Sequence, residues 1–372
     1  MSAATGAQPL FSVLDVEKAY EVGRAPPARR FARGEPRLLH ALDGVRLDVG
    51  EGDAVALVGE SGSGKSTLVR LMLGLEGATE GRLLYRGTDL GTLSGEARRA
   101  FSREVAYIYQ DARGSMNPRM RIGDVLAEPM RLHGLCTEAE VPARVGALLE
   151  RVGLSATMRD RFPSELSGGQ VRRVAVARAL ASEPKIVFAD ESVAGLDVSV
   201  QAQLLNLLRG LRREMGLTLV FITHDLGVAS YLCDRIAVMY LGRVVEEGPT
   251  GDVLTRPRHP YTRALMDAFP SFGRPLGAPL RGEIPSPIDL PRGCRFASRC
   301  PQAQDACRET EPVLVADGPG RRVACAFPLS SPSSPSSMSS MTSMTSTMSM
   351  TPVAPMTSVT SPAAAMPPEP AP

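Results

Sequence analysis

The chain has 372 residues and a formal net charge of +2, and its length allows one large domain with an appendage or two domains. The near-balanced charge gives no overall field that would attract nucleic acid, so we expect no nucleic-acid partner. No run approaches the roughly 18 apolar residues of a membrane-spanning helix, and the first residues do not have the pattern of a secretion signal. We therefore expect a cytosolic protein that reaches a membrane only through a partner.

Predicted strands and helices alternate along the first two thirds of the chain. A basic stretch rich in Pro and Gly, residues 22–37, reads as an exposed loop. The apolar run 185–189 suits a central strand that is buried on both faces. The alternation predicts an α/β fold with a mostly parallel sheet. We predict strands at 11–17, 45–49, 54–58, 81–85, 105–109, 185–189 and 217–222, a closing hairpin at 236–245, and helices at 68–73, within 121–153, at 170–181 and at 200–215.

The composition changes after about residue 256. Residues 256–329 are rich in Pro, carry four cysteines and are predicted to be irregular. Residues 330–372 consist almost wholly of Ser, Thr, Met, Pro and Ala and show no periodicity. Such a segment buries too little apolar surface to offset the entropy of ordering, so we predict a disordered tail.

A glycine-rich loop at residues 59–67 follows a predicted strand and precedes a predicted helix. This is the context in which the pattern G-x-x-x-x-G-K-[ST] binds nucleotide phosphates. Its glycines let successive N–H groups turn inward, Lys65 supplies a cation, and the Ser66 hydroxyl can ligate Mg²⁺. A turn that binds nothing is the alternative, but the chain has only three lysines and one lies in this motif. The predicted phosphate-binding residues are Gly59, Glu60, Ser61, Gly62, Ser63, Gly64, Lys65, Ser66 and Thr67.

Polar side chains follow three other predicted strands of the sheet. Gln110, the pair Asp190 and Glu191, and His224 each come at or just after the end of an apolar run. The carboxyl ends of parallel strands meet in one crevice, so these groups should lie near the phosphates. Asp190 can hold Mg²⁺ together with Ser66, and Glu191 can orient or deprotonate the attacking water. The alternatives are a helix cap for the acidic pair and an ordinary histidine at 224.

A second candidate anion site lies at the start of the helix predicted after residue 169. The sequence Leu-Ser-Gly-Gly-Gln occupies residues 166–170, where the serine can cap the helix and the glycines expose its N–H groups. One chain has no evident use for two such sites, but two chains do if each closes the other's nucleotide pocket. The residues concerned are Ser167, Gly168, Gly169 and Gln170.

The order of these motifs resembles the ATP-binding subunit of an ABC transporter over about residues 11–255. Finer matches resemble the oligopeptide/dipeptide importer branch, and all but the last of them resemble the second of its two ATPases more than the first. They are Tyr-Gln-Asp at 109–111, Met-Asn-Pro-Arg-Met at 116–120, Leu-Asp-Val-Ser-Val-Gln-Ala-Gln at 196–203 and His-Pro-Tyr-Thr at 259–262.

The resemblance implies a P-loop NTPase fold of the ABC type in residues 1–255. A mostly parallel sheet would be joined there by an antiparallel β-subdomain and by a helical subdomain at about 111–168. Residues 256–329 would form the importer-type C-terminal extension with its four cysteines, and 330–372 the tail. The implied function is ATP hydrolysis that powers import of peptides or a related solute. The alternatives are a soluble ABC ATPase of DNA repair or translation, and an ATP-binding subunit with a weakened catalytic site.

The resemblance also implies roles and partners. One ATP would lie between residues 59–67 of one subunit and Ser167 to Gln170 of the other, with Tyr20 stacked on adenine. Gln110 would sense Mg²⁺ and couple to the permease, and His224 would contact the γ-phosphate. The implied partners are a homologous ATPase in a head-to-tail heterodimer, two membrane permeases and an extracytoplasmic solute-binding protein. The subunit would be peripheral at the cytoplasmic face of the cell membrane.

The loop after the acidic pair departs from the family pattern. The family usually has Pro-Thr-Ser-Ala-Leu-Asp or Pro-Val-Ser-Ala-Leu-Asp, whereas residues 192–197 are Ser-Val-Ala-Gly-Leu-Asp. Ala194 lacks a hydroxyl, and Gly195 adds backbone freedom, which bears on communication between subunits. Because Glu191 is intact, we still predict a hydrolytic site.

The four cysteines Cys294, Cys300, Cys307 and Cys325 lie in the predicted extension. They include no C-x-x-C pair, so their spacing gives little support to a zinc ribbon. Thiolates in a cytosolic chain still favour a metal over a disulfide. The resemblance implies a [4Fe–4S] cluster, as in some members of the branch; zinc, free thiols and oxidised pairs are the alternatives. We expect the remaining cysteines, at positions 136 and 233, to be ordinary buried residues.

Overall fold

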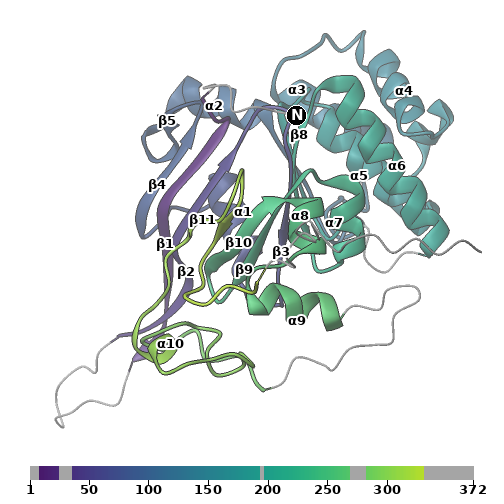
Figure 1. The fold of residues 1–372 in the computed structure, drawn as a ribbon. Coiled ribbons are helices and arrows are strands. Elements are labelled where there is room, and N and C mark those ends of the chain that lie inside the picture. The colour runs from purple at the N-terminus through teal and green to yellow at the C-terminus, as the bar shows by residue number, and fades with distance from the viewer. Residues whose placement is uncertain (1–7, 25–35, 193–196, 269–281, 331–372) are drawn as a thin grey trace, which may run out of the picture. The chain divides into compact units, whose positions relative to one another are not determined.

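The structure is a computed structural model that describes residues 8–24, 36–192, 197–268 and 282–330 (Figure 1). Residues 194 and 195 of the departing loop lie outside the described residues, as do most of the predicted loop 22–37 and the tail after residue 330. All described residues belong to one compact unit.

The described part of the chain contains a large mixed sheet whose strand order is β11-β12-β10-β9-β3-β8-β7-β6. Strands β6, β7, β8, β3 and β9 run parallel to one another, as the alternation of strands and helices predicts. Strand β10 returns antiparallel to β9 and confirms the predicted hairpin. The strands are β3 (Ala54–Val58), β6 (Val105–Ile108), β7 (Ile186–Asp190), β8 (Thr218–Thr223), β9 (Arg235–Tyr240), β10 (Arg243–Pro249), β11 (Val315–Ala316) and β12 (Arg322–Val323).

An antiparallel sheet with the order β2-β1-β4-β5 packs over one face of the large sheet. Its strands are β1 (Phe11–Arg24), β2 (Pro36–Val49), β4 (Glu80–Tyr85) and β5 (Thr88–Asp89). The first two are much longer than the predicted 11–17 and 45–49. The outer parts of β1 and β2 pair with each other, for example Tyr20 with Leu39, and do not pack against an apolar core. They therefore carry little of the apolar alternation from which a strand is predicted.

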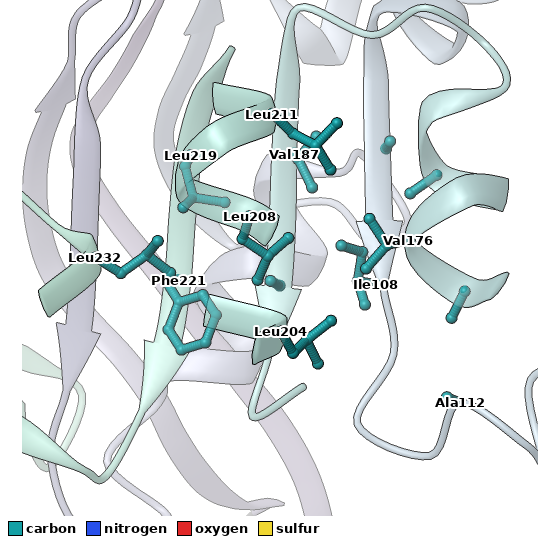
Figure 2. Close-up of a cluster of buried hydrophobic side chains, with 14 of the residues drawn as sticks. Ile108, Ala112, Val176, Val187, Leu204, Leu208, Leu211, Leu219, Phe221 and Leu232 are labelled. Carbon is teal, nitrogen blue, oxygen red and sulfur yellow. The ribbon is translucent and has the colours of Figure 1, made fainter. Parts of the chain in front are cut away.

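The central strands are buried on both faces, as predicted for residues 185–189. Along β7, Val187 and Ala189 belong to one apolar core, and Ile186 and Phe188 belong to the other. This alternation follows from the period of two residues along a strand. Figure 2 shows the first core, where leucines at 204, 208 and 211 point from a helix toward the sheet. The large sheet is therefore enclosed from both sides.

Helices between the strands cover one face of the large sheet and add to the antiparallel sheet that covers the other. The first core is covered by α5 and α6 and the second contains residues of α1. Helices α3 and α4 lie between β6 and β7, where the periodicity predicts a helical insert. The helices are α1 (Lys65–Met72), α2 (Gly95–Glu104), α3 (Ile122–Leu132), α4 (Val141–Arg151), α5 (Gly168–Leu180), α6 (Val198–Met215), α7 (Leu226–Leu232) and α8 (Thr250–Thr255), with short 3₁₀ turns at Leu90–Thr92, Ala156–Asp160 and Pro163–Glu165. Helices α2, α7 and α8 are not among the predicted elements.

The segment after residue 256 is more ordered than the predicted irregular chain. It contains α9 (Pro260–Ala268) and α10 (Ala306–Glu309), and its strand β12 pairs with β10 of the large sheet. Its Phe296 is buried in the first core and packs edge-on against Tyr240, with ring centroids 5.4 Å apart. Helix α10 and strand β12 have only four and two residues and show no measurable periodicity, which is why the sequence pattern does not reveal these two elements.

Within the described ranges, no helix combines the length and the apolar character that a bilayer crossing requires.

Candidate functional site

The glycine-rich loop at residues 59–64 joins β3 to α1 and has the backbone that its sequence predicts. Gly59 and Gly64 have φ angles of 153° and 101°, which favour glycine. A Cβ atom at Gly59 would lie 2.2 Å from the carbonyl oxygen of Met239, so no larger residue fits there. No side chain caps the first turn of α1. The N–H groups of this helix start are therefore available to an anion.

Lys65 is folded back over this loop. Its Nζ donates to the carbonyl oxygens of Gly59 and Glu60, each at 2.8 Å, and to Oγ of Ser63 at 3.2 Å. The side chain is 8% exposed, and burial lowers the pKa of its ammonium group, although Glu191 and Asp190 oppose this. A phosphate would give this buried cation an anionic partner.

The loop forms one wall of a cavity of about 520 Å³. The other walls come from β1 and β2 and from the ends of β6, β7 and β8. The structure thus brings together the polar groups predicted to meet there. Pro287 of the C-terminal segment also lines the cavity; its carbonyl oxygen accepts from the His40 N–H at 2.9 Å. The lining residues are Tyr20, Leu39, His40, Ala41, Gly59, Ser61, Gly62, Ser63, Gly64, Lys65, Ser66, Thr67, Gln110, Asp190, Glu191, Ile222, His224 and Pro287.

Asp190 and Ser66 are close enough to share an ion. The Ser66 hydroxyl donates to Oδ2 of Asp190 at 3.4 Å, a long contact in which both oxygens face the cavity. Tyr107 donates to the same oxygen at 2.9 Å, and burial together with Asp190 raises the pKa of the Tyr107 hydroxyl. An oxygen pair of this kind suits Mg²⁺. The sequence pattern does not single out Tyr107, because a tyrosine inside a strand looks like an ordinary core residue.

Glu191 contacts both of the other predicted catalytic residues. Its Oε2 accepts from Nε2 of Gln110 at 2.9 Å, and its Oε1 lies 2.6 Å from Nδ1 of His224. The backbone of Glu191 is left-handed, with a φ of 38°, and its N–H donates to the Ile222 carbonyl of β8 at 3.0 Å. Such a backbone costs free energy in a residue with a Cβ atom.

Tyr20 lies on β1 at the rim of the same cavity. Its hydroxyl donates to Glu76 at 2.6 Å, and the Lys18 ammonium lies 5.0 Å from the centre of its ring. These two contacts fix the position of the ring at the rim of the cavity.

The segment 166–170 is built as predicted but lies away from the cavity. Oγ of Ser167 accepts from the Gln170 N–H at 3.4 Å, and Oε1 of Gln170 accepts from the Ser167 N–H at 3.0 Å, which forms a capping box for α5. Ser167 and Gly168 are exposed. Of the described residues, none in this segment lines the cavity around Lys65. One chain therefore does not bring the two anion sites together.

The four cysteines of the C-terminal segment line one small cavity beside His259 and Phe296. All are free thiols, and burial raises the pKa of Cys294 and of Cys300, and that of Cys325 to about 11. Among the described residues, no three His, Cys, Asp or Glu side chains are arranged to hold a single metal ion. This arrangement speaks against a preformed zinc site. Outside the cluster, Cys233 is buried as expected, but Cys136 is partly exposed.

The mostly parallel sheet, the phosphate-binding loop at residues 59–67 after β3 (the phosphate loop), the acidic residues at the end of β7 and the separate helical insert together define a P-loop ATPase. Comparisons with known proteins narrow this class. Residues 42–194 match the family described as ABC transporter, and residues 245–307 match the one described as oligopeptide/dipeptide transporter, C-terminal region. The chain belongs to the ABC transporter family.

Relatives cover nearly the whole described part of the chain. The oligopeptide transport ATP-binding protein OppF of Escherichia coli is 44% identical over 321 residues, which are 84% of this chain and 95% of OppF. A Brucella ovis protein with the provisional name peptide import ATP-binding protein is 45% identical over 320 residues, or 85% and 97% of the two chains. Among solved structures, the dimeric cassette MJ0796 bound to ADP and Pi is similar, with a TM-score of 0.56, 29% identity, and coverage of 64% of this chain and 98% of MJ0796.

Proposed function

We propose that this chain hydrolyses ATP to power the import of peptides or a related solute through a membrane permease. The cavity that joins the phosphate loop to Asp190, Glu191 and His224 carries this proposal. The C-terminal match at residues 245–307 and the names of the relatives support the peptide branch. No observation favours an ATPase of DNA repair or translation.

The groups that line the cavity have different roles in binding and hydrolysing the triphosphate. The loop N–H groups and Lys65 bind the outer phosphates, and Ser66 with Asp190 would hold Mg²⁺, which offsets the phosphate charge. Glu191 is the general base that takes a proton from the attacking water. His224 lies 2.6 Å from this carboxylate, holds it in place and would contact the terminal phosphate. Gln110 donates to the same carboxylate through its amide and would sense the bound Mg²⁺.

A second ATPase subunit completes the site. The exposed Ser167 at the capped start of α5 can approach a phosphate only from another chain, because it lies outside its own chain's cavity. We infer a head-to-tail pair with a homologous subunit, in which ATP closes the interface and hydrolysis opens it. The dimeric state of MJ0796 supports such an arrangement.

This chain has a groove in which a permease could dock. A hollow of about 870 Å³ lies between β6, α3 and α5 and includes Gln110, which also lines the ATP cavity. Its rim exposes Tyr109 and Leu132, which are 46% and 78% exposed. Gln110 therefore touches both the nucleotide cavity and the surface where a helix of a permease would bind. Two permeases and an extracytoplasmic binding protein would complete the importer, with this subunit on the cytoplasmic face.

We further propose that the four cysteines hold an iron–sulfur cluster. Support comes from their convergence on one cavity and from the absence of disulfides among the described residues. A cluster of four irons is wider than one ion, so it needs ligands more widely spaced than a zinc site does. Anaerobically purified protein should be brown and contain iron and sulfide, and Cys300→Ser should lose both. Colourless protein without iron would contradict this part of the proposal.

Reconstituted vesicles test the transport function. The full chain is assembled with its companion ATPase, permease pair and peptide-loaded binding protein. Loaded binding protein should stimulate ATP hydrolysis, and labelled peptide should accumulate only with ATP on the ATPase side. Hydrolysis that ignores the binding protein, with no ATP-dependent uptake of any tested peptide, would overturn the importer assignment.

A further inference from the structure

Glu60, the second residue of the phosphate loop, is held by an arginine that lies 239 positions further along the chain. Nη1 of Arg299 donates to Oε2 of Glu60 at 2.7 Å, and Nη2 donates to Oε1 at 3.0 Å. The Arg299 side chain is 3% exposed. Two parallel, charge-assisted bonds of this kind fix both the position and the orientation of a carboxylate. The C-terminal segment is thus bound directly to the phosphate loop by this ion pair.

A second side chain from the same segment holds the backbone of Glu60. The Glu60 N–H donates to the hydroxyl of Tyr261 at 2.9 Å. Tyr261 is fully buried, and its ring lies 4.6 Å from that of Tyr240 and 5.3 Å from that of Phe296, measured between centroids. Arg299 also donates to the Tyr240 hydroxyl at 3.3 Å. An aromatic cluster in the core therefore positions both groups that contact Glu60.

Glu60 in turn contacts Lys65 of the proposed ATP site, so fixing Glu60 also restrains Lys65. Its carbonyl oxygen accepts from Nζ of Lys65 at 2.8 Å. A neighbouring contact acts on the other side of the loop, because the Gly242 N–H donates to the Ser63 carbonyl at 3.0 Å and the buried Arg295 donates to the carbonyl of Leu241. The phosphate loop is thus fixed from both sides by residues that its own sequence motif does not include.

We propose that Arg299 and Tyr261 are positioning residues for ATP binding: they hold Glu60 so that the phosphate loop has its binding conformation before the nucleotide arrives. This inference rests on the proposed role of residues 59–67. A loop that is already ordered loses less conformational entropy on binding, so the contacts should appear as nucleotide affinity. Without Arg299, the Glu60 carboxylate faces an aromatic cluster and should turn toward solvent, which would move the loop backbone.

Nucleotide affinity of the full chain tests this role. Calorimetry with Mg²⁺ and the non-hydrolysable analogue AMP-PNP compares wild type, Arg299→Gln, Glu60→Gln and the double variant, each well below its melting temperature. Each single change should weaken binding by roughly 5- to 150-fold, the range of a typical coupling between sites. The double variant should bind no more weakly than the weaker single variant. Arg299→Lys keeps the charge but loses the fork and should fall between wild type and Arg299→Gln.

Two controls separate positioning from general stability and from the site assignment. Arg258 forms a similar forked pair with Asp317, at 2.6 and 3.1 Å, so Arg258→Gln should lower the melting temperature without changing affinity. Lys65→Ala should lose binding if residues 59–67 are the site. If folded Arg299→Gln and Glu60→Gln bind AMP-PNP with normal affinity while Lys65→Ala does not bind it, the positioning role is overturned and the assignment of the site stands. Should Arg299→Gln not fold, Glu60→Gln decides, since its amide keeps the shape and the backbone contact to Tyr261.

Discussion

His224 and Glu191 are in direct contact, with Nδ1 of the histidine 2.6 Å from Oε1 of the carboxylate. Gln110 donates to the other carboxylate oxygen, so both oxygens of Glu191 are engaged inside the cavity. A carboxylate held at both oxygens has a fixed orientation, as a general base requires.

Glu191→Gln should keep ATP binding and stop turnover. The amide preserves the shape of the side chain but cannot accept a proton from water, so the hydrolysis rate should fall by about 100-fold or more. Phosphate release and retention of labelled ATP check both halves of this expectation. Glu183→Gln, which alters only a surface pair with Arg144, should leave the rate unchanged. Undiminished hydrolysis in Glu191→Gln would show that the base lies elsewhere.

Tyr107→Phe should weaken the response to magnesium. The change removes the hydroxyl that donates to Asp190 at 2.9 Å, and loss of such a supporting hydrogen bond typically costs roughly 10- to 100-fold in metal affinity. ATP hydrolysis measured against Mg²⁺ concentration should show a higher half-maximal value. Tyr109→Phe is the matched control, because Tyr109 is 46% exposed and lies beyond the strand end. Equal magnesium curves for wild type and Tyr107→Phe would remove this residue from the site.

Asp43 should contribute an acid-sensitive part of the stability. Burial raises the pKa of its carboxyl, but the ion pairs with Arg295 and Arg243 have the larger combined effect and lower this pKa below 3.8. The unfolded chain therefore takes up the proton first as the pH falls, and the contribution is present above about pH 4 and is lost below it. Urea unfolding at pH 7, 5, 4 and 3 should show a flatter acid dependence for Asp43→Asn. An unchanged acid dependence would mean that Asp43 is not responsible.

Much of the fold and of the cavity follows from local patterns. The apolar run at 54–58 corresponds to β3, and Lys65 is found from the glycine-rich pattern that follows it. Asp190 and His224 are found because each stands at or just after the end of a parallel strand, where such strands converge. Tyr107 is not found, because its chemistry depends on which neighbour its hydroxyl meets. The contact of Arg299 with Glu60 is equally hidden, since 239 positions separate the two and the sequence around Arg299 shows no regular pattern. Contacts of this kind are decided by tertiary packing.

Photocleavage by trapped vanadate tests the shared nucleotide site most directly. Vanadate takes the place of the terminal phosphate, and ultraviolet light then cuts the backbone beside it. In the assembled, unmutated transporter, we expect cuts in this chain both within residues 59–67 and at Ser167, because Ser167 would face the companion subunit's nucleotide. Cuts confined to residues 59–67, with segment 166–170 intact while vanadate is trapped in both ATPase subunits, would contradict the head-to-tail pair.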